Sequence, residues 1–276
     1  MTRFSQRVGE RAPFNSGLED ASQNLRVATW NKLHELLLPT SQDQWRAYQR
    51  RASRIWDFLG WATDEVSIHA FDARRTLKAY WFDKSDWHEF FDLFEFGVIL
   101  IASEMGAHRA GFFEIFNVVL EEQGCAYRFI AEELAPITNP IEMSEVSTAA
   151  ESSIASVAQH IRAALSLLPP NAELSPRNSV KESISAVEAA LKHLTNNPSA
   201  DLTSALSAFE RRYGPMHPAL RGGLVKLYGY TSDEKGIRHA LVDEAVAITV
   251  DDARFMLVTC SAFANYLVAL ASRKSA

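Results

Sequence analysis

The chain has 276 residues, 47% of them hydrophobic and 22% charged, a composition that supports a sizeable core and excludes an intrinsically disordered protein. The formal net charge is −6, divided into −5 for residues 1–140 and −1 for residues 141–276. This acidic balance disfavours a general polyanion-binding surface but is compatible with a local basic groove. P-loop, Gly-rich dinucleotide, HExxH and GxSxG motifs are absent, so four common enzyme classes have no support in the sequence.

The cysteine count and the length of the apolar runs indicate in which cellular compartment the protein is expected. Cys125 and Cys260 are too few for a disulfide framework, so two reduced thiols are expected, and no Cys or His cluster has metal-ligand spacing. The amino terminus has no apolar stretch of signal-peptide length, and the strongest apolar run, residues 96–102, is far shorter than a membrane span. We therefore expect a cytoplasmic protein with no membrane segment, metal or other cofactor.

Residues 1–140 are predicted to form an aromatic-rich helical domain. All six Trp and thirteen of the sixteen Phe lie in this region, and apolar residues recur every three or four positions. Ser41 and Ser85 suit helix N-caps. Two short runs with aromatic and β-branched residues predict a small β-hairpin within 125–138. The helices are expected over 20–38, 42–61, 72–83, 85–103 and 107–123.

Residues 141–276 are rich in Ala, Ser and Leu, which predicts a second helical domain with a differently built core. Pro136, Asn139 and Pro140 place the boundary near residue 140. The fold class is thus mostly α, with two helical domains, 1–140 and 141–276, and one hairpin between their helices. Helices are expected in the stretch 154–168 and over 176–195, 201–213, 217–228 and 250–272, with an irregular segment at 229–248.

A basic set lies among the aromatic residues of the predicted helix 42–61. Guanidinium groups beside aromatic faces would suit phosphate and base binding. Acidic residues are close by in the sequence, however, and a solvated, salt-bridged face is the favoured interpretation. The basic residues are Arg46, Arg50, Arg51 and Arg54, with Arg74, Arg75 and Lys78 on the next helix; the acidic ones are Asp43, Asp57, Asp64 and Glu65.

Two segments of the second region carry candidate site residues. Asp233, Arg238 and His239 lie in a polar, Gly-containing segment just ahead of the last helix, where a loop could present an imidazole at a surface. On the predicted helix 176–195, Lys181 lies four residues after Arg177, and Glu182 four residues after Asn178, so each pair shares a helix face. Each segment also has an ordinary interpretation. His239 could be a loop histidine that hydrogen-bonds a carbonyl, and the polar residues of the helix could form a solvated face.

Several stretches resemble a known family. FSQRVGERAP, LRVATWNKL and GFFEIFNVVLEEQGCAYRFI resemble the N-terminal domain of AbiJ-type abortive infection proteins. RNSVKESISAVEAAL, HPALRGGLVKLYGYTSDEKGIRHAL and DDARFMLVTCSAFANYLV resemble the C-terminal domain that accompanies it, which is similar to HEPN domains. The resemblance implies a bacterial antiphage protein with a C-terminal HEPN-like helical bundle, a homodimer, and RNA and a phage or host protein trigger as partners.

The HEPN resemblance also implies a chemistry, metal-independent RNA cleavage. His239 would be the general acid or base and Arg238 the phosphate stabiliser, with Asp233, Glu182, Lys181 and Asn178 in support. The family's motif has an Arg four to six residues before its His, whereas residues 230–235 contain no Arg, and Arg238 is directly adjacent to His239. A non-catalytic binding or dimerisation module is therefore the alternative, and an accessible His239 beside a basic cavity would separate the two hypotheses.

Overall fold

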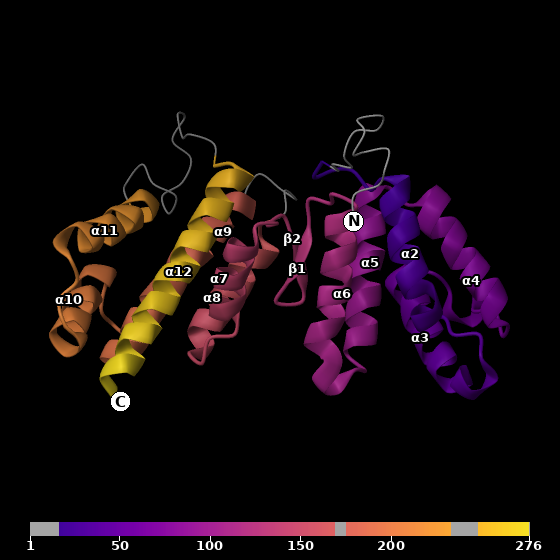
Figure 1. The fold of residues 1–276 in the computed structure, drawn as a ribbon, viewed down its shortest axis with the longest axis horizontal. Helices are drawn as coiled ribbons and strands as arrows, with labels where there is room; N and C mark the ends of the chain where they lie inside the picture. The colour runs from indigo at the N-terminus through magenta and orange to yellow at the C-terminus, as the bar shows by residue number, and fades with distance from the viewer. Residues whose placement is uncertain (1–16, 169–174, 233–247, 276) are drawn as a thin grey trace. The chain divides into compact units, whose positions relative to one another are not determined.

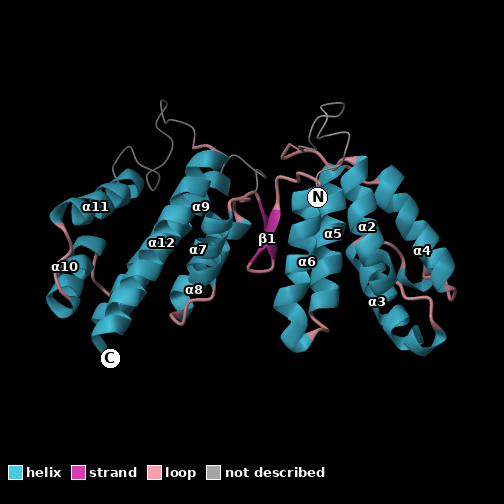
Figure 2. Cartoon of the chain, in the orientation of Figure 1, coloured by secondary structure: helices cyan, strands magenta, loops and turns pink. Residues whose placement is uncertain are grey.

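A computed structural model describes residues 17–168, 175–232 and 248–275. In these ranges the chain forms eleven α-helices and one two-stranded hairpin (Figure 1; Figure 2), which confirms the predicted mostly-α class. The chain divides into two compact units, residues 1–134 and 135–276. Each unit is described separately.

The first unit contains five helices followed by the hairpin. A π-helical turn, Tyr80–Lys84, joins the third helix to the fourth. The hairpin strands are β1 (Arg128–Ile130) and β2 (Glu133–Ala135), inside the predicted range. The helices are α2 (Gln23–Leu37), α3 (Trp45–Phe58), α4 (Ala70–Ala79), α5 (Trp87–Ala102) and α6 (Arg109–Glu122).

Aromatic side chains fill the core of the first unit. Trp81 is fully buried, and its ring meets Trp30, Phe90 and Phe94 at centroid distances of 5.6, 5.1 and 6.3 Å. All three contacts have the edge-to-face geometry that aromatic pairs favour. The core therefore depends on the shape of large rings contributed by α2, α5 and the π-helical turn.

The buried guanidinium of Arg26 connects α2 to the start of α5 through hydrogen bonds. Arg26 donates to the carbonyl of Trp81, to the Ser85 hydroxyl (2.7 Å) and to the Ser85 carbonyl (3.0 Å). Desolvation by burial lowers the pKa of Arg26, against the opposing charge of Asp86. The prediction that Ser85 caps the helix is wrong: Asp86 is the N-cap, and its amide pairs with Glu89 (2.9 Å), while Ser85 serves Arg26.

The hairpin is attached to α6 by side chains at both of its ends. Asn117 holds β1 by donating to the carbonyl of Phe129 (3.0 Å) and accepting from its amide (2.7 Å). The two turn residues, Ala131 and Glu132, both have positive φ angles (47° and 78°), as a two-residue hairpin turn requires. Arg109 of α6 donates two hydrogen bonds to the carboxylate of Glu132, and the bond from Nε is 2.5 Å long.

The described residues of the second unit form six α-helices. The first of them was not predicted: Asn139 accepts hydrogen bonds from the amides of Ile141 and Glu142, and Pro140 occupies the first helical turn, so these residues start a helix. The fifth continues beyond the predicted end at 228, to residue 232. The helices are α7 (Pro140–Ala150), α8 (Ala155–Ser166), α9 (Ser175–Thr195), α10 (Leu202–Tyr213), α11 (Pro218–Ser232) and α12 (Val250–Ser275).

Small side chains dominate the packing of this unit, in which α9 packs against α8, α10 and α12, and α12 also packs against α7. Ser179, Ser183, Ala186 and Ala190 of α9 are fully buried. Among the described residues, α12 alone is long and apolar enough to cross a membrane by length and composition, and 39% of its most apolar stretch is buried. The buried residues of α12 pack against α9 and α7.

Candidate functional site

The predicted site residues fall into two groups. Asp233, Arg238 and His239 lie outside the described residues. Asn178, Lys181 and Glu182 lie on α9, whose opposite side is buried in the core of the second unit. All three are partly exposed, as expected for the polar side of an amphipathic helix.

Glu182 forms a pair with a histidine that the sequence did not point to. His160 of α8 places Nδ1 2.7 Å from Oε2 of Glu182, and each side chain is about one-third exposed (35% and 34%). A carboxylate only accepts hydrogen bonds, so Nδ1 donates and Nε2 is left as the basic nitrogen. The arrangement is an oriented imidazole on the outer side of α8 and α9. Asn178 and Lys181 make no side-chain hydrogen bond with another described residue.

The pairing of His160 with Glu182 depends on how α8 and α9 align. Ser179 donates to the carbonyl of Ala164 (2.7 Å), which fixes the two helices in antiparallel register. His160 lies one turn before Ala164 on α8, and Glu182 lies about one turn after Ser179 on α9, so the same register places the two side chains in contact. No local spacing reveals such a pair, because the partners are separated by 22 positions; only a predicted helix-hairpin register could have found it.

The basic set of the first unit is largely salt-bridged, as the favoured interpretation held. Arg51 and Arg50 pair with Glu104 (2.6 and 3.2 Å), and Arg74 pairs with Glu35 (3.6 Å). Arg75 pairs with Asp72, three positions before it (3.4 Å), whereas the partners of the other three cations are distant in the sequence: Glu104 follows α5 and Glu35 belongs to α2. These three cations therefore neutralise distant carboxylates and join helices.

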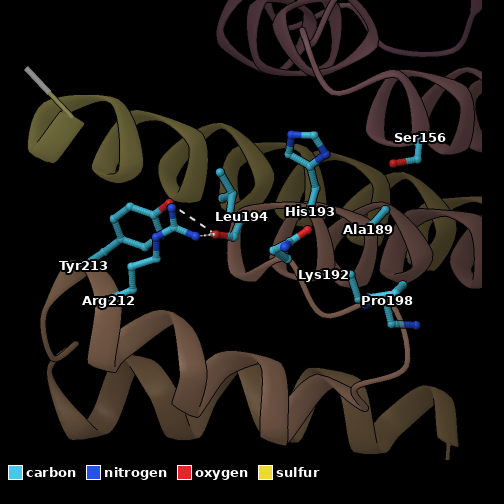
Figure 3. A pocket seen from close by; sticks show the side chains of 9 residues that line it. Ser156, Ala189, Lys192, His193, Leu194, Pro198, Arg212 and Tyr213 are labelled. Carbon is cyan, nitrogen blue, oxygen red and sulfur yellow. Dashed lines mark hydrogen bonds between the residues drawn. The ribbon is translucent and has the colours of Figure 1, made fainter.

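A pocket of about 780 Å³ opens beside the carboxyl ends of α9 and α10 (Figure 3). Asn196, with φ of 53°, ends α9 in the left-handed conformation common at helix C-termini, and Pro198 turns the chain away. Arg212 and Tyr213 return to donate hydrogen bonds to the carbonyl of Leu194 (3.0 and 3.2 Å). The lining residues are Ser156, Ala189, Lys192, His193, Leu194, Asn196, Pro198, Arg212 and Tyr213.

Neither thiol is available as a nucleophile near neutral pH. Burial raises the pKa of Cys125 to about 11 and that of Cys260 to about 12, and the thiolate is the reactive form. Both cysteines are free and buried in the cores of their units. Within the described ranges, no group of three or more His, Cys, Asp or Glu side chains could hold a metal ion.

Comparison with known families places the chain among abortive-infection proteins. The model of AbiJ N-terminal domain 4 matches residues 2–152, more than half of the sequence. The chain belongs to the AbiJ N-terminal domain 4 family, which confirms the predicted AbiJ-type resemblance of the first region. No curated protein and no solved structure gives a significant match.

Two of the family-like stretches of the first unit have structural roles, and the third, FSQRVGERAP, lies outside the described residues. In LRVATWNKL, the side chains of Leu25, Arg26, Trp30 and Leu33 are buried, and in the longer stretch near residue 120, Asn117 holds the hairpin. The matched segment also extends past the boundary at 134 to include α7, which packs in the second unit. The matched segment thus covers the first unit and the first helix of the second.

Proposed function

We propose that the protein acts in the bacterial cytoplasm as an antiphage, abortive-infection protein. The observation that carries the proposal is the family match over residues 2–152. In this proposal the first unit meets a phage or host protein trigger, and the second unit, a HEPN-like bundle, acts on RNA. Plating efficiency of phage on cells that express the wild-type chain, compared with cells carrying an empty vector, tests the defence role; equal plating would contradict it.

The reaction proposed for the second unit is metal-independent RNA cleavage. A base takes the proton of the ribose 2′-hydroxyl, the 2′-oxygen attacks phosphorus, and the bond to the 5′-oxygen breaks as that oxygen is protonated. His239 is the proposed acid or base and Arg238 stabilises the phosphorane, with Asp233, Lys181 and Asn178 in support. The His160–Glu182 pair supplies a second oriented imidazole, with Glu182 as its positioning residue.

Purified protein with labelled RNA tests this reaction. Cleavage should persist in chelator, should be lost in His239→Ala, and should fall in His160→Gln. Glu182→Gln should lower cleavage, because an amide oxygen replaces the carboxylate that orients the His160 imidazole and makes a weaker hydrogen bond. Glu151→Gln, an exposed carboxyl change at the end of α7, is the matched control. Undiminished RNA in the presence of wild-type protein, together with protection against phage, would favour the non-catalytic binding alternative.

We infer that homodimerisation uses the exposed face of α12. Phe255 and Tyr266 are 61% and 39% exposed, and with Thr259, Ala262 and Ala269 they repeat at spacings of four and three, as in a helix-pairing seam. Acidic Asp251 begins the helix and Arg273 lies near its end, so an antiparallel copy places opposite charges together.

Sedimentation of the wild-type protein and of Tyr266→Asp tests this assembly. A two-chain mass that becomes a one-chain mass in the variant is expected, because the aspartate would bury a charge in the seam. Lys32→Asp, an exposed change in the first unit, should leave the two-chain mass unchanged. A one-chain mass for the wild-type protein at micromolar concentration would contradict the inference.

A further inference from the structure

The pocket beside the ends of α9 and α10 has a basic lining. Lys192, His193 and Arg212 can each carry a positive charge, and none of the nine lining residues is acidic. Glu188 forms an ion pair with Lys192 at 3.6 Å, which offsets part of the positive charge of the lining. We propose that this pocket binds the phosphate of a nucleotide unit, carried either by single-stranded RNA or by a free nucleotide. The choice of RNA as a source rests on the proposed function.

The pocket's donors are already held in place. Arg212 commits Nη1 to the carbonyl of Leu194, which fixes the guanidinium and leaves further N–H groups of its fork for an anion. The imidazole of His193 is exposed and makes no hydrogen bond with another described residue, and the exposed Asn196 adds an amide. A phosphate offers several acceptor oxygens to such a set, and charge-assisted bonds are the stronger kind.

The end of a helix ordinarily repels anions, because its last carbonyls carry partial negative charge. Here the carbonyl of Leu194 accepts hydrogen bonds from both Arg212 and Tyr213. These two donors offset its negative charge at the pocket wall. The local field of the site is therefore set by the cationic side chains.

An aromatic group adjoins the cations. The guanidinium of Arg212 lies 5.3 Å from the ring centre of Tyr213, and both residues line the pocket. A planar guanidinium beside an aromatic ring is a surface on which a base can stack. The volume, about 780 Å³, lies in the range of small-ligand pockets. Phosphate donors and a stacking surface together match a nucleotide better than a simple anion.

The variant that tests the site is Lys192→Gln combined with His193→Gln. Neither side chain bonds to Leu194, so the junction of α9 and α10 is retained, and only the Lys192–Glu188 pair is lost. Arg211→Gln is the matched control, since Arg211 is exposed on the same helix as Arg212 but does not line the pocket. Circular dichroism of each variant checks the fold.

Binding is measured by fluorescence anisotropy with a single-stranded RNA whose 2′-hydroxyls are methylated, and by calorimetry with AMP. The methylated strand cannot be cleaved through its 2′-oxygens, so binding is separated from catalysis. We expect the double variant to weaken RNA binding about tenfold or more and Arg211→Gln to change it less than about twofold. Binding of AMP alone, lost in the double variant, would support the pocket with free nucleotide as its source and contradict RNA as the substrate.

Other results would overturn the site. Equal losses in the double variant and in Arg211→Gln would show that diffuse charge, not the pocket, attracts RNA. Full RNA affinity in the double variant would reject the pocket while leaving RNA cleavage by the second unit intact. Failure of the wild-type protein to bind either probe would also reject it.

Discussion

The two units pack their helices with different kinds of side chain. The first encloses Trp81, Phe90 and Phe94 in edge-to-face contact or stacked parallel, whereas α9 of the second buries Ser183, Ala186 and other small residues. Large rings demand a matching cavity; small side chains let helix backbones approach, and their hydroxyls bond to helix carbonyls. The comparison teaches that the first unit should be most sensitive to lost volume and the second to added volume.

The largest effect is expected from removing volume in the first unit. Trp81→Ala should lower the free energy of unfolding by about 4 kcal/mol, because the surrounding rings cannot collapse into the vacated space. Urea unfolding followed by circular dichroism measures it. Trp45→Ala removes a ring that is 39% exposed and should cost well under half as much. Equal losses would contradict a core organised around Trp81.

A pH effect should also separate the units. Glu95 of α5 accepts the amide of Leu134 at 2.5 Å, and burial raises its pKa to about 7, although that hydrogen bond opposes the shift. Since the folded pKa is above the unfolded value, its contribution to stability is complete below about pH 4.5 and is lost as the pH rises through 7. The fully buried hydroxyls of the second unit do not titrate in this range.

Glu95→Gln tests that dependence. The free energy of unfolding of the variant should equal that of the wild-type protein near pH 4.5. At pH 8 it should be higher by up to about 3 kcal/mol, because the neutral amide avoids a buried charge. Urea unfolding at both pH values measures the difference. Glu114→Gln, a carboxyl change on α6, is the control and should show no such crossover. A variant less stable than wild type at pH 8 would reverse the assigned sign.

Adding volume to the second unit should have a moderate effect. Ala190→Leu inserts three carbons at a fully buried position of α9 and should cost about 2 kcal/mol by forcing neighbouring helices apart. Ala155→Leu makes the same change at an exposed position of α8 and should stay within about 0.5 kcal/mol. The two thermal unfolding curves should therefore separate. Coincident curves would indicate loose packing around α9.

The smallest effect is expected at the His160–Glu182 pair. Both side chains are about one-third exposed, so solvent screens their attraction, and His160→Gln should lower stability by less than about 1 kcal/mol. Urea unfolding at pH 7 checks this. A larger loss would assign the pair a structural role and would remove its value as a test of catalysis.

Much of the fold could be predicted from the sequence because helices and the hairpin have local signals. Two short runs with aromatic and β-branched residues predict the hairpin, whose strands begin at Arg128 and Glu133. Local signals gave a wrong prediction where a residue instead forms a hydrogen bond with a side chain that is distant in the sequence. Ser85 has the composition of a cap, but its hydroxyl accepts from Arg26, 59 positions away. Pro140 predicts a domain boundary near residue 140, but it also occupies the first turn of α7, a position that suits proline.

The candidate site could be predicted only in part. Asn178, Lys181 and Glu182 lie on the predicted helix, now α9, since the helical pattern is a property of that segment alone. The pairing of Glu182 with His160, and the grouping of Lys192 with Arg212, arise from contacts between helices. Sequence spacing contains no information about such contacts. The pocket is thus a product of how α9 ends and where α10 returns.

Helix α7 limits how this protein can be recombined. It lies inside the family-matched segment, yet Asn265 of α12 donates to the carbonyl and carboxylate of Glu145 on α7 (3.0 and 2.8 Å). A chimera that joins residues 2–152 to a foreign effector would carry α7 without its partner helix, leaving Val146 and its neighbours without apolar cover. When the amino-terminal segment is exchanged between proteins, a helix that complements α7 should therefore be transferred with it. In this chain, a functional chimera should have its junction before Asn139.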